Sequence, residues 1–339
     1  MTSLDVPLAY TLDSADLARL DTVLEHLRDH EDPADPLFYD RRRQAAEELP
    51  HGLRNFLLDF RHTEPAAACL IHGFPVDDVA IGPTPAHWEP AADGKSTRDQ
   101  ELLLALCGMA LGEPFTWSTL QSGRLVQNIL PIQGDERRQN GHGSETLLEF
   151  HTEDGFHPRR CDYLLLFGLR NPDRVPTIVS SVRDIRLSDE DRAILGERRF
   201  LIVPDDEHVR QLAERAPGHP ALREAQTMLE RPEPVALLFG HRVNPYLRID
   251  RPFTRCVGAD PVAEQAVERL MDELERVQQD VAVGPGSLLV VDNYLAVHGR
   301  RPFTVRYDGT DRWLKKLTVS RNLRPGFADR GSGSHRVLF

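Results

Sequence analysis

Three residues of the kinds that bind metals, together with one arginine, could form a single chemical site in this chain. His151 and Glu153 are separated by one residue in LEFHTEDG. His298 lies far along the chain in VDNYLAVHGR, and Arg312 follows it by fourteen residues. Two imidazoles and one carboxylate on one face of a metal leave positions open, which suits a non-heme iron(II) that also holds a cosubstrate and dioxygen. Arg312 would clamp the far carboxylate of that cosubstrate, so the set predicts an oxygenase that uses Fe(II), 2-oxoglutarate and O2.

The elements predicted around these residues would bring them together. A strand through the His-x-Glu pair would place both side chains on one face, because strand side chains alternate. His298 follows the apolar segment 287–293 after a short turn, so we expect it beside that buried strand. Arg312 precedes the apolar segment 313–320, and a hairpin between the two regions would bring it close to His298. Trp313 would then point the opposite way, into the core.

Each part of this set has a simpler explanation when it is taken alone. A His-x-Glu pair occurs by chance in many chains, and a lone histidine such as His298 is more often a hydrogen-bonded core or turn residue. The same ligands occur in zinc hydrolases, although the chain has no His-Glu-x-x-His helix and Arg312 would have no role in hydrolysis. A metal-free β-barrel that binds a small molecule is a third alternative. The carboxylate of Glu153 favours hydroxylation over halogenation, since Gly or Ala there would leave a metal position for halide.

Composition excludes several kinds of partner. The chain has 339 residues and a formal net charge of -12, which argues against a broad basic surface for nucleic acid. Its four cysteines are scattered without a Cys-x-x-Cys pair, a pattern typical of buried thiols in a reducing cytoplasm. There is no run of eighteen apolar residues and no signal-peptide pattern, so we expect no membrane span. A cytoplasmic protein that binds a small molecule is expected, and the sequence carries no signal for its oligomeric state.

Short apolar segments between turn-forming residues indicate a chain that is mainly β with flanking helices. The predicted strands are 68–74, 124–132, 162–169, 177–182, 199–203, 234–240, 245–250, 287–293 and 313–320. The predicted helices are 14–30 with Ser14 as N-cap, 42–60 with a break near Pro50, 99–111, 206–215, 220–230 and 262–280. No linker divides the chain. We therefore expect one domain over 1–339, with a helical part at about 1–65 packed on the β core and a loose tail after about 323.

Four stretches of the chain resemble one known family. They are HTEDGFHPRRCDYLLLFGLRNPDRVPT (151–177), IGPTPAHW (81–88), PYLRID (245–250) and VDNYLAVHGRRPFTVRYDGTDRWLKK (291–316). In these stretches the chain is similar to the clavaminate synthase-like iron(II)/2-oxoglutarate oxygenases, and most similar to the L-arginine hydroxylases of viomycin and streptothricin biosynthesis. The resemblance implies a distorted double-stranded β-helix, a jelly-roll barrel with helices outside. It also implies iron binding by His151, Glu153 and His298, and 2-oxoglutarate binding by Arg312 with help from Thr177.

The same resemblance implies where an amino-acid substrate binds. Asp250, at the end of PYLRID, would contact a guanidinium, although it could instead cap a turn. Gln121 would lie near the substrate amine, and Glu153 would also contact the substrate. Lys316, where the relatives carry Arg, would hold the substrate carboxylate by charge without a bidentate fork. The implied activity is hydroxylation of the β or γ carbon of a free basic L-amino acid, with L-arginine foremost, in antibiotic biosynthesis. A hydroxylase or desaturase of another free amino acid, such as lysine or an arginine derivative, is the alternative.

Overall fold

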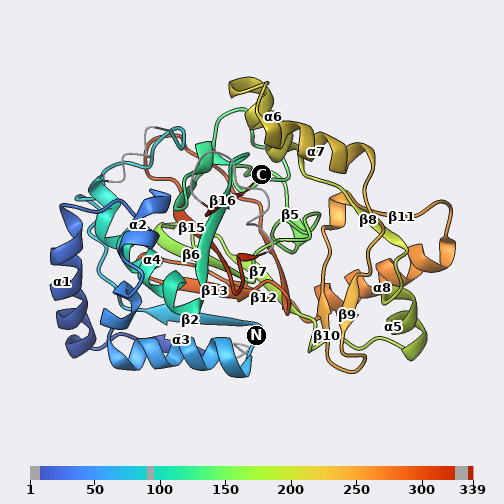
Figure 1. Ribbon diagram of the computed structural model, residues 1–339, viewed down its shortest axis with the longest axis horizontal. Coiled ribbons are helices and arrows are strands. Elements are labelled where there is room, and N and C mark those ends of the chain that lie inside the picture. The colour runs from blue at the N-terminus through green and yellow to red at the C-terminus, as the bar shows by residue number, and fades with distance from the viewer. Residues whose placement is uncertain (1–7, 90–94, 325–334, 339) are drawn as a thin grey trace.

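Two β-sheets that face each other form the centre of the molecule, and helices lie outside them (Figure 1). The computed structural model describes residues 8–89, 95–324 and 335–338. The large sheet has the strand order β1-β2-β13-β6-β15-β3-β16, and β4 also pairs with β15. The small sheet has the order β12-β7-β14-β5. The expected class, mainly β with flanking helices in a distorted double-stranded β-helix, is confirmed.

The strands are short, and most of their pairings join segments far apart in the sequence. The large sheet contains β1 (Ala9–Thr11), β2 (Ala68–His72), β3 (Glu113–Trp117), β4 (Gln127–Ile129), β6 (Tyr163–Arg170), β13 (Leu288–Asp292), β15 (Trp313–Ser320) and β16 (Val337–Leu338). The small sheet contains β5 (Leu148–His151), β7 (Thr177–Ser181), β12 (Gln279–Val281) and β14 (Ala296–Arg300). Two further antiparallel pairs are β9 (Leu238–Gly240) with β10 (Pro245–Leu247), and β8 (Phe200–Ile202) with β11 (Thr254–Cys256).

The helices form two groups on opposite sides of the sheets (Figure 1). The N-terminal group contains α1 (Ser14–Arg28), α2 (Pro36–Arg41), α3 (His51–Thr63) and α4 (Arg98–Leu111). The second group contains α5 (Asp189–Leu195), α6 (Asp206–Arg215), α7 (Pro220–Glu230) and α8 (Pro261–Arg276). Short 3-10 helices are η1 (Ala45–Glu48), η3 (Lys95–Thr97), η4 (Gln121–Gly123) and η5 (Arg251–Phe253). Among the described residues, none of these helices has the length and apolar surface needed to cross a lipid bilayer.

Alternation along β6 and β15 divides the apolar core into two layers. Leu165 and Phe167 of β6 pack against the N-terminal helices, whereas Leu166 packs between the two sheets. On β15, Trp313 belongs to the helix-facing layer, as expected, and Leu314 to the layer between the sheets. Because strand side chains alternate, the neighbours of Leu314 two residues away on either side also face the space between the sheets.

Several predicted boundaries are corrected by the structure. Helix α1 has Asp13, not Ser14, as its N-cap, because the Asp13 carboxylate accepts from the first-turn amides. The helix predicted at 42–60 is wrong in its first part, since Pro50 is the N-cap of α3 and the preceding residues form a turn and η1. The strand predicted at 124–132 is reduced to β4. The starts of α1 and α3 are set locally, by the Asp13 cap and by Pro50, whereas β4 is limited to the residues that pair with β15.

Candidate active site

The two histidines of the predicted site lie side by side on paired strands. His151 ends β5 and stands directly opposite His298 of β14 in the antiparallel ladder. Their ring centroids are 4.2 Å apart. Gly299 permits this close pairing, because a Cβ there would lie 2.4 Å from the Leu148 carbonyl oxygen. The sequence pattern thus located two residues that the fold places in contact.

Glu153 joins the histidines from a turn and not from the predicted strand. Strand β5 ends at His151, so the expected alternation on one strand does not place the carboxylate. One ligand atom from each of His151, Glu153 and His298 still lies within 4.8 Å of the others. Within the described ranges, no other group of three His, Cys, Asp or Glu residues meets that criterion. The set of two nitrogens and one oxygen suits a divalent transition metal such as iron(II).

Hydrogen bonds and burial keep these groups in the forms that metals bind. His151 Nδ1 is 2.9 Å from the Glu149 carbonyl oxygen, which makes Nδ1 the donor and leaves the Nε2 lone pair for a metal. Burial, with repulsion from His298, lowers the pKa of His151 to about 4, so this ring is neutral at pH 7. The Nδ1 atom of His298 is buried without a hydrogen-bond partner in the described part of the chain. The position of His298 therefore depends on its pairing with β5 and β7.

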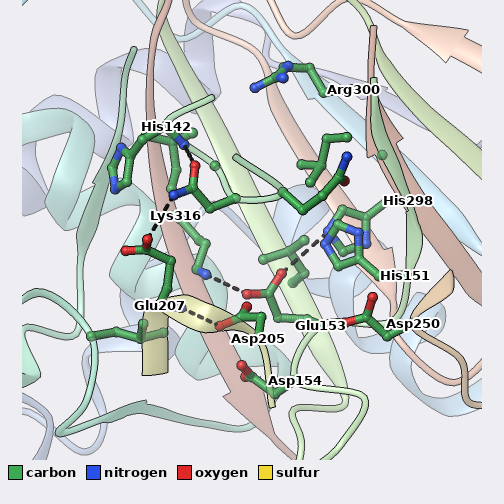
Figure 2. A pocket seen from close by; sticks show the side chains of 18 of the residues that line it. His142, His151, Glu153, Asp154, Asp205, Glu207, Asp250, His298, Arg300 and Lys316 are labelled. Atoms are coloured by element: carbon green, nitrogen blue, oxygen red, sulfur yellow. Dashed lines mark hydrogen bonds and ion pairs between the residues drawn. The ribbon is translucent and has the colours of Figure 1, made fainter. Parts of the chain in front are cut away.

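Lys316 holds the other side of Glu153 (Figure 2). Its Nζ lies 2.5 Å from Glu153 Oε1, and Glu153 Oε2 lies 3.4 Å from His298 Nε2. Burial alone would raise the pKa of Glu153, but the charge of Lys316 and the His298 contact lower it well below its usual range. The Glu153 carboxylate is therefore anionic at neutral pH. It lies between the ammonium of Lys316 and the imidazole ring of His298. Lys316 is itself largely enclosed, with 13% of its side chain exposed.

Arg312 enters the same cavity from the opposite sheet. The predicted hairpin is wrong: β14 pairs with β5 and β7, whereas β15 pairs with β6, β3 and β4. Arg312 and Lys316 line the cavity together with Leu314, since all three lie at alternate positions of one chain segment. The histidine and the arginine are therefore close because two sheets face each other, not because two strands are neighbours.

The guanidinium of Arg312 has few partners of its own. Its Nη2 donates a long hydrogen bond of 3.4 Å to Thr177 Oγ1, and its Nε is buried without a partner among the described residues. Burial, with the charge of Arg300 nearby, lowers the pKa of Arg312 to about 9. Arg300, which the sequence analysis missed, directs its own N–H groups to the carbonyl oxygens of Gly143 and Thr146. Two buried cations that have no carboxylate partner in the described part of the chain form an end of the cavity suited to an anion.

The other end of the cavity is acidic. Figure 2 shows Arg300 at one end of the site, with Asp154 and Asp205 at the other and Glu153 between them. Asp250 lies beside His151, with which it forms a β-bridge. Its carboxylate accepts no hydrogen bond from the described residues and does not cap the following turn. Burial, with repulsion from Asp205, raises the pKa of Asp250 well above its usual range.

The main chain at Asp250 is attached to the residues that follow His151. Thr152 donates its N–H to the Ile249 carbonyl oxygen at 2.7 Å, and its hydroxyl bonds to the same oxygen at 3.0 Å. Ile249 N–H donates in return to Thr152 Oγ1 at 3.3 Å. Strand β10 ends at Leu247, so this local clamp, rather than the predicted strand to 250, fixes Asp250. These hydrogen bonds tie the segment that carries Asp250 to the segment that carries His151 and Glu153.

Two further acids of the cavity differ in what they can still bind. Asp154 accepts from Trp117 Nε1 at 2.5 Å and lies 3.0 Å from His208 Nε2. Burial would lower the pKa of His208, but its hydrogen bond to Asp154 and the charges of Asp205 and Asp154 raise it, which favours the protonated ring beside Asp154. Asp205 uses Oδ1 to cap α6 through the amides of Glu207 and His208, and its other oxygen accepts no hydrogen bond from the described residues. Asp205 was missed, although PDDEH before a helix is a capping signal.

Gln121 lies in the cavity wall, and its side-chain amide forms two hydrogen bonds with the backbone of Asn128. Its Nε2 donates to the Asn128 carbonyl oxygen at 2.8 Å, and its Oε1 accepts from the Asn128 N–H at 3.0 Å. The Gln121 backbone N–H donates to Gln211 Oε1. One amide hydrogen and one oxygen lone pair are left for a ligand.

Comparison with known proteins relates the chain to dioxygenases and amino-acid hydroxylases. The profile of the taurine catabolism dioxygenase TauD, TfdA family matches residues 97–318. An enduracididine beta-hydroxylase of Streptomyces hygroscopicus is 38% identical over 339 residues, which cover 97% of this chain and 98% of that protein. An L-ornithine/L-arginine 3-hydroxylase of Catenulispora acidiphila is 40% identical over 303 residues, which cover 87% of this chain and 88% of that protein.

A solved structure is similar over nearly the whole fold. The crystal structure of the non-heme iron oxygenase OrfP in complex with Fe, succinate and (3S)-hydroxy-L-Arg has a TM-score of 0.90 and 38% identity, covering 98% of this chain and 99% of that one. The same oxygenase has been solved with Fe and alpha-ketoglutaric acid. The resemblance seen in the sequence motifs is confirmed. Because the profile covers more than half of the chain and the relatives align over most of their length, the chain belongs to the TauD/TfdA dioxygenase family.

Proposed function

We propose that this protein is an iron(II)- and 2-oxoglutarate-dependent oxygenase that hydroxylates a free basic L-amino acid, with L-arginine as the first candidate. The observation that supports it best is the cavity itself. Three potential metal ligands lie between a cationic end at Arg312 and an acidic end at Asp250. A dicarboxylate cosubstrate and a substrate with a cationic tip need those two ends at the same time.

In this proposal His151, Glu153 and His298 hold iron, which when bound supplies the activation of dioxygen coupled to decarboxylation of 2-oxoglutarate. Arg312, with Thr177 beside it, binds the distal carboxylate of the cosubstrate by a charge-assisted pair. The low pKa of Glu153 and the neutral His151 keep protons from competing for the metal positions.

The substrate would lie between Lys316 and the acidic end. Lys316 would hold the α-carboxylate, and Glu153 and Gln121 would lie near the α-amine. Asp250 and the free oxygen of Asp205 would accept the side-chain cation, because a carboxylate left alone in a closed site is costly and gains from a cationic partner. The names of the relatives support this class: one acts on ornithine and arginine, another on enduracididine, and OrfP was solved with hydroxylated arginine.

We also propose a role in antibiotic biosynthesis, by analogy with the enduracididine beta-hydroxylase, and a cytoplasmic location. The four cysteines are free thiols in the structure, which fits a reducing compartment. The carbon that is oxidised depends on substrate placement, and the β or γ position of the side chain is proposed.

The test is a substrate panel with the purified protein, Fe(II), ascorbate and 2-oxoglutarate under air. L-arginine, L-ornithine, L-lysine, enduracididine and L-asparagine are each incubated, and succinate and the amino-acid masses are measured. The expected result is an added oxygen on a basic amino acid, in an amount equal to succinate. Best turnover of the neutral L-asparagine would contradict the substrate class. If the protein is loaded with zinc in place of iron and still converts one of these compounds without forming succinate, the hydrolase alternative is favoured instead.

A further inference from the structure

We infer that Asn293 is a positioning residue for the proposed metal-binding carboxylate of Glu153. This inference rests on the proposed function of the site and adds a residue to it. Glu153 has no strand neighbour of its own, since β5 ends two residues before it. Its peptide is held instead by the side chain of Asn293, which lies 140 positions away in the sequence.

One amide group satisfies both backbone groups of Glu153. Asn293 Oδ1 accepts from the Glu153 N–H at 2.7 Å, and Asn293 Nδ2 donates to the Glu153 carbonyl oxygen at 3.0 Å. The second Nδ2 hydrogen goes to the Cys161 carbonyl oxygen, also at 3.0 Å. The side chain thus replaces the strand that would otherwise pair with this peptide, and it closes the loop between Glu153 and Cys161 at both ends.

Asn293 is itself held rigidly. It is fully buried and begins the three-residue turn between β13 and β14. Its backbone N–H donates to the Asp162 carbonyl oxygen at 2.8 Å. Asp292 Oδ1 accepts from the N–H groups of Tyr294 and Leu295 and closes the turn. Burial and these hydrogen bonds restrict the Asn293 side chain, and through it the Glu153 peptide that it bonds.

The turn that carries Asn293 also leads into the strand that carries His298. Strand β14 leaves the turn and carries His298 three residues after Leu295. The same turn therefore places His298 through the strand and Glu153 through the Asn293 amide. Without that amide, the buried N–H and C=O of Glu153 would have no partner, and the loop would move to satisfy them. The carboxylate would then leave the place where it faces both histidines.

Asn171 provides a matched control with the same bonding pattern. It is also buried, accepts from the Val175 N–H at 2.9 Å, and donates to the carbonyl oxygens of Val175 and Val283 at 2.9 and 3.1 Å. It follows β6, whereas the Asp162 that bonds Asn293 precedes β6. The two asparagines are thus roughly 25 Å apart along an eight-residue strand at about 3.3 Å per residue. Loss of either should disturb stability similarly, but only Asn293 contacts a proposed metal ligand.

The experiment measures binding of Mn²⁺ alone, from the electron paramagnetic resonance of the free ion, without cosubstrate or substrate. Asn293→Ala should weaken Mn²⁺ binding by roughly 10- to 100-fold, the usual cost of removing a residue that orients a metal ligand. Asn171→Ala should leave the affinity within about twofold, because distant sites are independent. Thermal unfolding of both variants checks that they are folded and similarly destabilised.

Asn293→Asp decides the result if the alanine variant does not fold. The aspartate keeps an acceptor for the Glu153 N–H but sets an oxygen against two carbonyls, so positioning predicts weaker binding. A purely electrostatic role predicts tighter binding, because a carboxylate is added near the cation. Unchanged or tighter Mn²⁺ binding in folded Asn293 variants would overturn the inference while leaving the proposed function intact. If the unmodified protein binds no Mn²⁺, the proposed function itself fails.

Discussion

Replacement of Arg312 should separate cosubstrate binding from stability. Arg312 is 6% exposed. Among the described residues its side chain makes one hydrogen bond, which is 3.4 Å long, and its Nε is buried without a partner. Burial holds its pKa down at about 9, which means that the folded protein disfavours the isolated cation. In the ligand-free state this residue therefore contributes little to stability. On the proposed assignment, Arg312 gains a favourable ion pair only when the 2-oxoglutarate carboxylate binds.

The expected loss of 2-oxoglutarate affinity follows from that geometry. Leaving one member of a buried ion pair without its partner costs roughly 3–5 kcal/mol. Arg300 stays in place and offsets part of this, so Arg312→Ala should weaken 2-oxoglutarate binding by roughly 100- to 1,000-fold, at 1.4 kcal/mol for each factor of ten. Arg312→Lys keeps the charge without the bidentate fork and should lose about tenfold. Thr177→Val removes only a long hydrogen bond and should lose no more than about tenfold.

Two measurements on the same variants test this reasoning. Calorimetric titration of the Mn²⁺-loaded protein with 2-oxoglutarate gives the affinity, and denaturant unfolding of the ligand-free protein gives the stability. We expect Arg312→Ala to lose affinity while its unfolding midpoint stays the same or rises, because a buried unpaired charge has been removed. Unchanged 2-oxoglutarate affinity would remove Arg312 from the site. A large fall in the midpoint would show that Arg312 is structural.

Three other predictions concern the metal, the substrate and the fold. His298→Ala should abolish substrate-dependent succinate formation with the fold intact by circular dichroism, and full activity would contradict the ligand assignment. Asp250→Asn should raise the KM for L-arginine by roughly 10- to 100-fold, from 1.5–3 kcal/mol for a hydrogen bond to a charged group, while Mn²⁺ affinity stays the same. Lys315→Met leaves the carboxylate of Glu101, 2.6 Å from Nζ and 1% exposed, without its ion-pair partner and should lower the free energy of unfolding by roughly 3–5 kcal/mol. Adding Glu101→Leu to that variant should restore most of the loss, and a destabilisation below about 1 kcal/mol would contradict the buried-pair argument.

The sequence predicted the residues of the site more accurately than the strands and turns that carry them. The ordered set of His151, Glu153, His298 and Arg312 gathers in one cavity, as predicted from residue types and spacing. Helices α6 and α7 have the predicted bounds, because capping and helical periodicity are local signals. The strand assigned to Glu153 and the hairpin assigned to Arg312 were wrong, because pairing between distant strands is not written in either segment alone.

The residues that were missed share one physical property. Asp205 caps a helix, Arg300 donates to carbonyl oxygens alone within the described ranges, and Asn293 bonds to a peptide 140 positions away. Each acts through partners that only the folded chain provides. A capping signal existed for Asp205, but nothing in the sequence showed that its second oxygen would open into a cavity.

The alternation along β15 has a consequence for how substrate range can change. On the proposed assignment, Arg312 and Lys316 anchor the two carboxylates, and Arg312 directly precedes β15 while Lys316 lies four residues later within it, an interval of roughly 13 Å at 3.3 Å per residue. The distance between the two side chains is constrained, because β15 is paired from Trp313 to Ser320 with β6 and β3 of the large sheet. Adaptation to a longer or shorter amino acid would therefore occur at the Asp250 and Asp205 end, which is formed by a turn and a helix start. Substitutions there would shift side-chain selectivity and leave the demand for a free α-carboxylate unchanged.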